Sequence, residues 1–223
     1  MSLIIAIDGP SGSGKSTLGR MLSQALSLLY IDTGSMYRAV ALATLEAGLD
    51  PNDQESIVKL AQGLSINLEG DADSLKTLIG NRDVSELIRT ERVTEMSSKV
   101  SAISGVRKAM VERQRELGKR GAVLNGRDIT TVVFPDADFK FYLDANPEER
   151  AQRRYLEDQL KSNETSLEAT LADMIDRDTR DSTRADSPLK IADDAIVIDS
   201  TGKSIDEVFQ EMMVRVLAAD KRG

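Results

Sequence analysis

The sequence contains no cysteine and no histidine. Without cysteine the chain can form no disulfide and has no thiol nucleophile. Without histidine it lacks the usual general base and the commonest zinc ligand. Any chemistry must therefore depend on carboxylates, lysine, arginine and bound ions.

Long apolar segments are also absent. No stretch approaches the roughly 20 residues that span a bilayer, and the N-terminus lacks a basic segment followed by a cleavable apolar one. We therefore expect a soluble, cytoplasmic protein with no membrane partner. Acidic residues outnumber basic ones by 37 to 29, for a net charge of -8. That excess argues against nucleic-acid binding, which requires many neutralised phosphates, although a local basic cluster can still bind one small anion.

A chain of 223 residues with 40% hydrophobic content can bury one sizeable core with small inserted lobes. Apolar segments alternate with helical patterns along most of it, which predicts an α/β fold with a parallel sheet flanked by helices in three layers. Ligands of such sheets bind at the carboxyl ends of the strands. The expected strands cover residues 3–7, 28–31, 122–124, 139–143 and 195–198.

A glycine-rich segment, Gly9-Pro-Ser-Gly-Ser-Gly-Lys15-Ser16, follows the first apolar run. The pattern GxxxxGK[ST] at a strand-to-helix junction turns backbone amides and a helix N-terminus toward phosphate oxygens. We interpret it as a P-loop that binds the phosphates of a nucleoside triphosphate. The residues predicted to hold ATP are Gly9, Pro10, Ser11, Gly12, Ser13, Gly14, Lys15, Ser16 and Thr17.

Residues 64–90 show a different pattern, with short alternating pieces separated by glycines. This pattern predicts a small β-rich insert. Farther along, Asn146-Pro147 is a typical helix start. Capping-box spacings at Thr165 with Glu168 and at Ser204 with Glu207 predict further helix starts.

An arginine cluster lies in the second half of the chain. Arg177, Arg180, Asp181 and Arg184 share one face if the segment is helical. Taken alone, the cluster is typical of a solvated helix face with Asp-Arg pairs. Beside a triphosphate loop, it favours stabilisation of a phosphoryl group in transfer. We interpret residues 153–185 as a lid, with Arg153 and Arg154 as possible members of the cluster and the polar residues 161–164 as a movable connection.

A P-loop alone does not identify a reaction. Asn125-Gly-Arg-Asp128 superficially resembles the NKxD motif of GTPases, but glycine replaces the lysine. A DxxG sequence at Asp199 to Gly202 lies downstream of it, in the wrong order for a GTPase switch. Both differences argue against a GTPase.

Taken together, the motifs resemble those of the bacterial cytidylate kinases, in the nucleoside monophosphate kinase group, along essentially the whole chain. The segments that carry the resemblance are residues 8–15, 32–38, 84–85 with 88–90, 106–107 before 114–115, 126–128 with 131–137, and 177–184 leading to Pro188-Leu189. The resemblance implies transfer of the γ-phosphoryl group of ATP to CMP, and to dCMP. Mg²⁺ would enter as Mg-ATP, and the enzyme would be a monomer. It also implies a core at residues 1–63, 101–152 and 186–223, with a monophosphate-binding insert at 64–100 and the lid at 153–185.

The resemblance further implies a role for individual residues. Ser98, Arg107 and Asp128 would form the base pocket, and Arg177 and Asp181 would face the ribose. Arg38, Arg127 and Arg184 would hold the acceptor phosphate, with Thr33 and Tyr37 nearby. The residues expected to be catalytic are Lys15, Arg127, Arg177, Arg180 and Arg184.

Several of these positions also have a plain structural interpretation. Tyr37 can be a packing residue, and Arg107 and Ser98 can lie on the surface. The chain departs from the family at Asn125, where relatives carry an acid, and at Thr130, which replaces a glycine. Ser16 is a candidate Mg²⁺ ligand, although some relatives have glycine there.

Three alternative functions remain at this stage. The chain could phosphorylate another small acceptor such as UMP or an alcohol. It could instead be a nucleotide-dependent switch that hydrolyses ATP or GTP alone, or a noncatalytic relative that only binds nucleotide.

Overall fold

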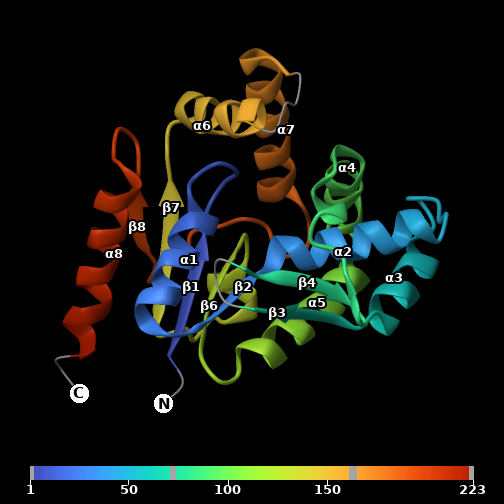
Figure 1. Ribbon diagram of the computed structural model, residues 1–223, viewed down its shortest axis with the longest axis horizontal. Coiled ribbons are helices and arrows are strands. Elements are labelled where there is room, and N and C mark those ends of the chain that lie inside the picture. The colour runs from blue at the N-terminus through green and yellow to red at the C-terminus, as the bar shows by residue number, and fades with distance from the viewer. Residues whose placement is uncertain (1–2, 71–73, 161–164, 221–223) are drawn as a thin grey trace.

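The computed structural model describes residues 3–70, 74–160 and 165–220. Its centre is a five-stranded parallel sheet with the order β2-β6-β1-β7-β8 (Figure 1). Every segment expected to be a strand of this sheet is one, which confirms the predicted α/β class. The strands are β1 (Ile4–Asp8), β2 (Leu29–Asp32), β6 (Ala122–Gly126), β7 (Phe139–Asp144) and β8 (Ile196–Asp199).

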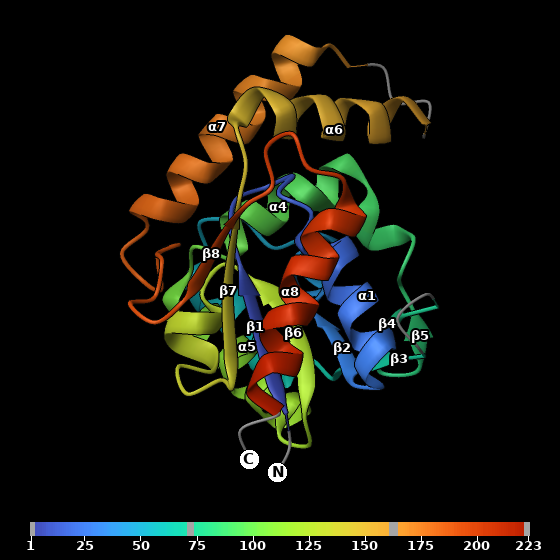
Figure 2. The same ribbon diagram turned by 90° about the vertical axis from the view of Figure 1, so that its left-hand side faces the viewer.

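Helices cover both faces of the sheet. Ile5 and Ile7 of β1 pack into a cluster with α1 and α8, and both helices lie on the near face in Figure 2. Ala6 points the other way, into a cluster with α2, α4 and α5. Ile5 and Ile7 are fully buried, and burying an aliphatic side chain of this size contributes about 1.5–3 kcal/mol. The helices are α1 (Lys15–Leu26), α2 (Thr33–Glu46), α3 (Gln54–Gly63), α4 (Glu91–Val100), α5 (Ser104–Gly118), α6 (Pro147–Leu160), α7 (Leu167–Thr183) and α8 (Ile205–Asp220), with a 3-10 helix η1 (Leu87–Arg89) and a π-helical turn η2 (Ile129–Val133).

The predicted β-rich insert is present as a three-stranded antiparallel sheet in the order β3-β4-β5. Its strands are β3 (Ile66–Glu69), β4 (Lys76–Ile79) and β5 (Arg82–Asp83). Helix α3, just before the insert, was not predicted. Asp53 caps it by accepting a hydrogen bond from the Ser56 amide, and it buries Ile57 and Ala61.

Helices α6 and α7 form a separate pair above the sheet (Figures 1 and 2). Helix α6 runs without a break across residue 153, where we expected the lid to begin. The predicted cap of α7 is wrong by one residue, because Ser166 rather than Thr165 accepts from an amide of the first turn, that of Ala169. The predicted movable connection at residues 161–164 lies outside the described residues.

The capping box at the start of α8 is confirmed. The Ser204 amide donates to the Glu207 carboxylate at 2.8 Å, and the Glu207 amide donates to the Ser204 hydroxyl at 3.3 Å. Within the described residues, no helix is both long enough and apolar enough to cross a membrane.

Candidate active site

The glycine-rich segment forms the predicted strand-loop-helix junction, because β1 ends at Asp8 and α1 begins at Lys15. Gly9, Gly12 and Gly14 all have positive φ angles, which glycine adopts without steric cost. A Cβ atom at Gly9 would lie 2.0 Å from the Leu143 carbonyl oxygen. Glycine is therefore required where the loop passes the end of β7.

Lys15 lies folded into this loop. Its Nζ donates to the Pro10 carbonyl at 2.5 Å and to the Ser13 hydroxyl at 3.2 Å. Burial lowers the pKa of Lys15 well below its usual value, and the nearby Arg127 charge lowers it further. The negative charge of a bound polyphosphate would act in the opposite direction and favour the charged lysine.

Asp8, at the end of β1, holds the segment that follows β6. Its carboxylate accepts hydrogen bonds from the Ile129 amide at 3.0 Å and from the Thr130 amide and hydroxyl, both at 2.7 Å. Asp8 is fully buried, and burial raises the pKa of its carboxyl above the usual value. The P-loop strand and the loop that carries Arg127 and Asp128 are thus fixed to each other. We did not assign Asp8 a role from the sequence, although it directly precedes the P-loop.

Replacing Thr130 with valine is expected to destabilise the fold in a pH-dependent way. Burial makes the ionised form of Asp8 cost free energy in the folded state, and this cost appears as the pH rises through the raised pKa of Asp8. The hydrogen bond from the Thr130 hydroxyl stabilises the ionised carboxylate and offsets part of the cost. Losing this bond should lower the free energy of unfolding by about 1.5–3 kcal/mol where Asp8 is ionised. Below the raised pKa of Asp8, the loss should shrink.

Urea unfolding of wild type, Thr130→Val and Thr130→Ser, from about pH 8 down to about pH 4, measures this effect. Thr130→Ser keeps the hydroxyl and serves as the control. A loss in Thr130→Val that is equal across the pH series would contradict the role assigned to the hydroxyl.

Arg107 and Asp128 form a buried ion pair. Arg107 Nη2 lies 2.5 Å from Asp128 Oδ2, and both side chains are at most 5% exposed. The Arg107 guanidinium lies over the Tyr37 ring, 5.3 Å from its centre. Burial alone would lower the pKa of Arg107, but Tyr37 and Asp128 raise it overall. The surface interpretation of Arg107 is therefore wrong.

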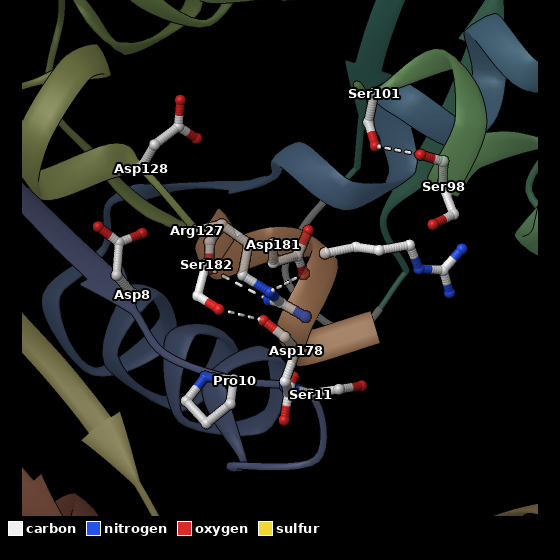
Figure 3. Close-up of polar contacts among 12 residues, drawn as sticks. Asp8, Pro10, Ser11, Ser98, Ser101, Arg127, Asp128, Asp178, Asp181 and Ser182 are labelled. Carbon is white, nitrogen blue, oxygen red and sulfur yellow. Dashed lines mark hydrogen bonds and ion pairs between the residues drawn. The ribbon is translucent and has the colours of Figure 1, made fainter. Parts of the chain in front are cut away.

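Tyr37 is buried beside this pair, and burial raises its pKa to about 12. Ser98 is half-buried and linked to the pair through Ser101. Arg107 Nη1 donates to the Ser101 carbonyl at 3.1 Å, and the Ser101 hydroxyl donates to the Ser98 carbonyl at 3.2 Å. In Figure 3, Ser98 and Ser101 lie across from Asp128.

The end of α7 meets the loop after β6 through a second set of charges. Asp181 accepts from Arg127 Nε at 2.9 Å and from Arg184 Nη1 at 3.3 Å. Arg184 Nη2 also lies 4.0 Å from Asp128. Burial and the Arg127 charge lower the pKa of Arg177 to about 10. The structure thus brings Arg127, Arg177, Asp181 and Arg184 together with the Arg107–Asp128 pair.

Not every predicted arginine joins this group. Arg180 is exposed, and its Nε donates to the Asp176 carbonyl at 3.3 Å. Arg153 instead pairs with Glu149 and with Ser200, and Arg154 pairs with Asp158 at 3.0 Å. The helix ends at Thr183, so Arg184 has extended rather than helical backbone, and the expected common helical face is only partly formed.

Helix α2 contributes further predicted residues. Arg38 lies 3.2 Å from Asp32 in an ion pair, and the Thr33 hydroxyl donates to the Asn125 carbonyl at 2.8 Å. The side-chain amide Nδ2 of Asn125 in turn donates to the Ser16 hydroxyl at 3.2 Å. These contacts connect the ends of β2 and β6 to the start of α1.

Ser16, the predicted Mg²⁺ ligand, carries a hydroxyl oxygen, which is the kind of ligand that a hard cation takes. It is exposed, one residue after Lys15, whereas both carboxylate oxygens of Asp8 are used by η2. Among the described residues, no cluster of three or more acidic side chains could hold a metal ion. Such a cation would therefore have to be held mainly by ligand phosphates and water, as is usual for Mg²⁺.

Asp178 and Arg150 were missed by the sequence analysis. Asp178 accepts from the Ser11 amide at 3.0 Å and from Arg150 Nη1 at 2.6 Å. Asp178 belongs to the Arg177-Asp178 motif, but nothing local in the sequence indicates that it contacts the P-loop.

Comparison with known proteins agrees with this arrangement. The cytidylate kinase family model matches residues 5–217. The chain is 47% identical over 211 residues to a cytidylate kinase of Geobacter sp. (strain M21), covering 94% of this chain and 91% of that one. It is 48% identical over 212 residues to a cytidylate kinase of Syntrophotalea carbinolica, covering 95% and 90%.

A structural comparison supports the fold. The crystal structure of an uncharacterized protein from Eubacterium ventriosum matches with a TM-score of 0.55 at 11% sequence identity, covering 98% of this chain and 99% of that one. At that identity the likeness speaks for the fold alone. The family match, which spans the P-loop, the Arg107–Asp128 pair and α7, shows that the chain belongs to the cytidylate kinase family.

Proposed function

We propose that this protein transfers the γ-phosphoryl group of ATP to CMP, and to dCMP, giving ADP and the nucleoside diphosphate. The observation that carries the proposal is the placement of two sites on one sheet edge. Strand β1 ends in the P-loop, and the adjacent strand β6 ends just before Arg127 and Asp128. The relatives are named cytidylate kinases, which points to CMP as the acceptor. The buried Arg107–Asp128 pair offers a physical reason for the recognition of cytosine.

The donor nucleotide would lie on the P-loop. Loop amides and Lys15 would hold its phosphates at the start of α1. The Ser16 hydroxyl would hold Mg²⁺ together with the ATP phosphates. When bound, the ion would supply positive charge that offsets the negative charge of the transferring group.

The acceptor nucleotide would be recognised by charge. The Asp128 carboxylate can accept from the exocyclic amine of cytosine, but would repel the carbonyl oxygen that uracil presents at the same position. Ser98 and Arg107 would complete the base site. Arg177 and Asp181 would contact the ribose. The acceptor phosphate would be held by Arg38, Arg127 and Arg184, near Thr33 and Tyr37.

The chemistry would be direct in-line transfer without a covalent enzyme intermediate. The chain has no histidine to phosphorylate, and the acceptor phosphate is already ionised, so a strong general base is unnecessary. Positioning and charge neutralisation would carry the catalysis. Arg127, Arg177 and Arg184 would surround the transferring group.

Closure of the lid would complete the site. Movement of α6 and α7 would bring Arg180, exposed in this structure, toward the phosphates and exclude water, which limits ATP hydrolysis. A single chain supplies all of these residues, so we propose that the enzyme acts as a monomer. We also propose that it acts in the cytoplasm.

The direct test is CMP-dependent release of ADP in a coupled assay with ATP and Mg²⁺. We expect turnover on the order of 1–100 per second with CMP, and a rate lower by orders of magnitude without an acceptor. UMP and small alcohols serve as comparison acceptors. A preference for one of these would indicate a different kinase, and acceptor-independent hydrolysis would indicate a nucleotide-dependent switch. Nucleotide binding without turnover would indicate a noncatalytic relative.

A further inference from the structure

The P-loop is in direct contact with the lid helix α7 through one carboxylate. The Ser11 amide donates to Asp178 Oδ1 at 3.0 Å, across 167 residues of sequence. Figure 3 shows Asp178 extending from α7 toward Ser11 of the P-loop. This carboxylate is not among the residues that the proposed function assigns to either nucleotide.

Arg150, at the start of α6, completes this contact. Its Nη1 donates to Asp178 Oδ2 at 2.6 Å and to the Ser11 carbonyl at 2.8 Å, while its Nε donates to the Ala145 carbonyl at 2.9 Å. The Arg150 side chain is 7% exposed, and that of Asp178 is 19% exposed. The backbone N–H and the backbone carbonyl of Ser11 are thus both held by side chains of the lid helices, and each oxygen of Asp178 has its own donor.

Close packing reinforces these hydrogen bonds at the next residue of the loop. A Cβ atom at Gly12 would lie 2.9 Å from the Arg150 carbonyl oxygen and 2.9 Å from the Met174 methyl carbon. The loop therefore passes so close to α6 and α7 at Gly12 that no side chain would fit between them. Burial lowers the pKa of Lys15, and the negative charge of nearby Asp178 offsets a small part of that lowering.

The same helix carries acceptor-site residues on either side of Asp178. Arg177 precedes it, and Asp181, one turn later, binds Arg127 at 2.9 Å. An α-helix moves as a rigid unit because its backbone hydrogen bonds are all internal, so a displacement at one residue is transmitted along the helix. A change in the P-loop at Ser11 would therefore move Asp181 and the residues that follow it.

We propose that Asp178, supported by Arg150, is a positioning residue that couples occupation of the ATP site to the affinity of the CMP site. The inference rests on the proposed function, because it concerns the same two substrates. Binding of ATP phosphates fixes the P-loop, the P-loop fixes Asp178, and α7 then holds Arg177, Asp181 and Arg184 in the arrangement that binds CMP. By thermodynamic linkage, CMP strengthens the binding of ATP by the same factor.

Asp178→Asn is the most discriminating variant. Asparagine keeps the size of the side chain but offers one acceptor oxygen, so its amide nitrogen faces either the Ser11 N–H or the Arg150 guanidinium, both of which are donors. Asp173→Asn is the matched control, because Asp173 is an exposed residue of the same helix. Arg150→Met removes the other partner and provides a second, independent variant.

The measurement is isothermal titration of CMP into enzyme alone and into enzyme saturated with a non-hydrolysable ATP analogue and Mg²⁺. For wild type and Asp173→Asn, we expect the analogue to tighten CMP binding by about 5–150-fold, the usual range of such coupling. For Asp178→Asn and Arg150→Met, we expect that factor to fall to within about twofold of unity, with CMP binding to the enzyme alone little changed. Reverse titrations of the analogue should give the same factors.

The outcomes separate this inference from the proposed function. A wild-type enzyme that neither binds nor phosphorylates CMP would refute both. A wild type that phosphorylates CMP but shows no coupling would refute the inference alone. So would a folded Asp178→Asn variant that retains the wild-type coupling factor. Lower thermal stability with unchanged coupling would likewise mean that Asp178 is only structural.

Discussion

Arg184→Ala is expected to lower kcat by about two to four orders of magnitude, while the protein remains folded. Arg184 sits where the proposed acceptor phosphate, Asp181 and Asp128 converge, with its side chain 9% exposed. Its Nε and Nη2 donate to the Ser187 carbonyl at 2.8 and 2.5 Å, which holds the guanidinium in place. A preorganised cation at this position stabilises charge that spreads over the transferring group.

Folding should survive this change because Arg184 lies just after the end of α7 and belongs to neither hydrophobic core cluster. Burial lowers its pKa, and the Arg107 charge lowers it further, so neighbouring cations repel it. The alanine substitution removes this repulsion, and it also removes one of the hydrogen-bond partners of Asp181. The Arg127 guanidinium still pairs with Asp181 at 2.9 Å.

The assay follows ADP release under saturating ATP and CMP, with thermal unfolding measured in parallel. Arg184→Lys keeps the charge but loses the planar fork, so we expect an intermediate rate. Arg120→Ala is the control, because Arg120 is an exposed arginine just before the start of β6, at the opposite edge of the sheet. Near-normal turnover in a folded Arg184→Ala enzyme would exclude the proposed role.

The sequence predicts those parts of the site that depend on local pattern. The P-loop is a local motif, and its strand and helix could be placed from the apolar runs on either side. The capping box at Ser204 was correct for the same reason. The cap of α7 was misplaced by one residue because Thr165 and Ser166 are chemically interchangeable as caps.

Contacts between distant segments could not be predicted in this way. Asp8 binds Thr130 across 122 residues, and Asp178 binds Ser11 across 167. Such pairs depend on which strands lie side by side and on where α7 docks, and no periodicity of one segment encodes either. The resemblance to a family placed Arg107 in the site, whereas composition alone favoured the surface. Only the structure brings Arg150 to the P-loop.

Asp128 is expected to control the choice of base. In Asp128→Ala, the preference for CMP over UMP, measured as the ratio of kcat/KM values, should fall by at least about tenfold. The reason is the loss of the carboxylate that accepts from the cytosine amine and repels the uracil carbonyl. A site built around such a carboxylate rejects uracil strongly, because binding uracil would leave buried polar atoms without hydrogen-bond partners.

The alanine variant also removes the partner of a buried cation. Arg107 is 3% exposed, and an unpaired buried charge costs about 3–5 kcal/mol. Asp128→Ala should therefore unfold at a lower temperature than wild type. Asp128→Asn avoids part of this cost, because its amide oxygen can still accept from Arg107 Nη2 while its amide nitrogen presents a donor.

Asp128→Asn thus tests recognition separately from stability. Its amide can donate to the uracil carbonyl, so UMP should gain in kcat/KM relative to CMP even in an enzyme that remains folded. Steady-state kinetics with CMP and UMP on both variants measure the ratio, and Asp193→Asn, at an exposed site before β8, is the control. An unchanged ratio in a folded Asp128→Asn enzyme would mean that the buried carboxylate serves Arg107 alone, and that another residue distinguishes the two bases.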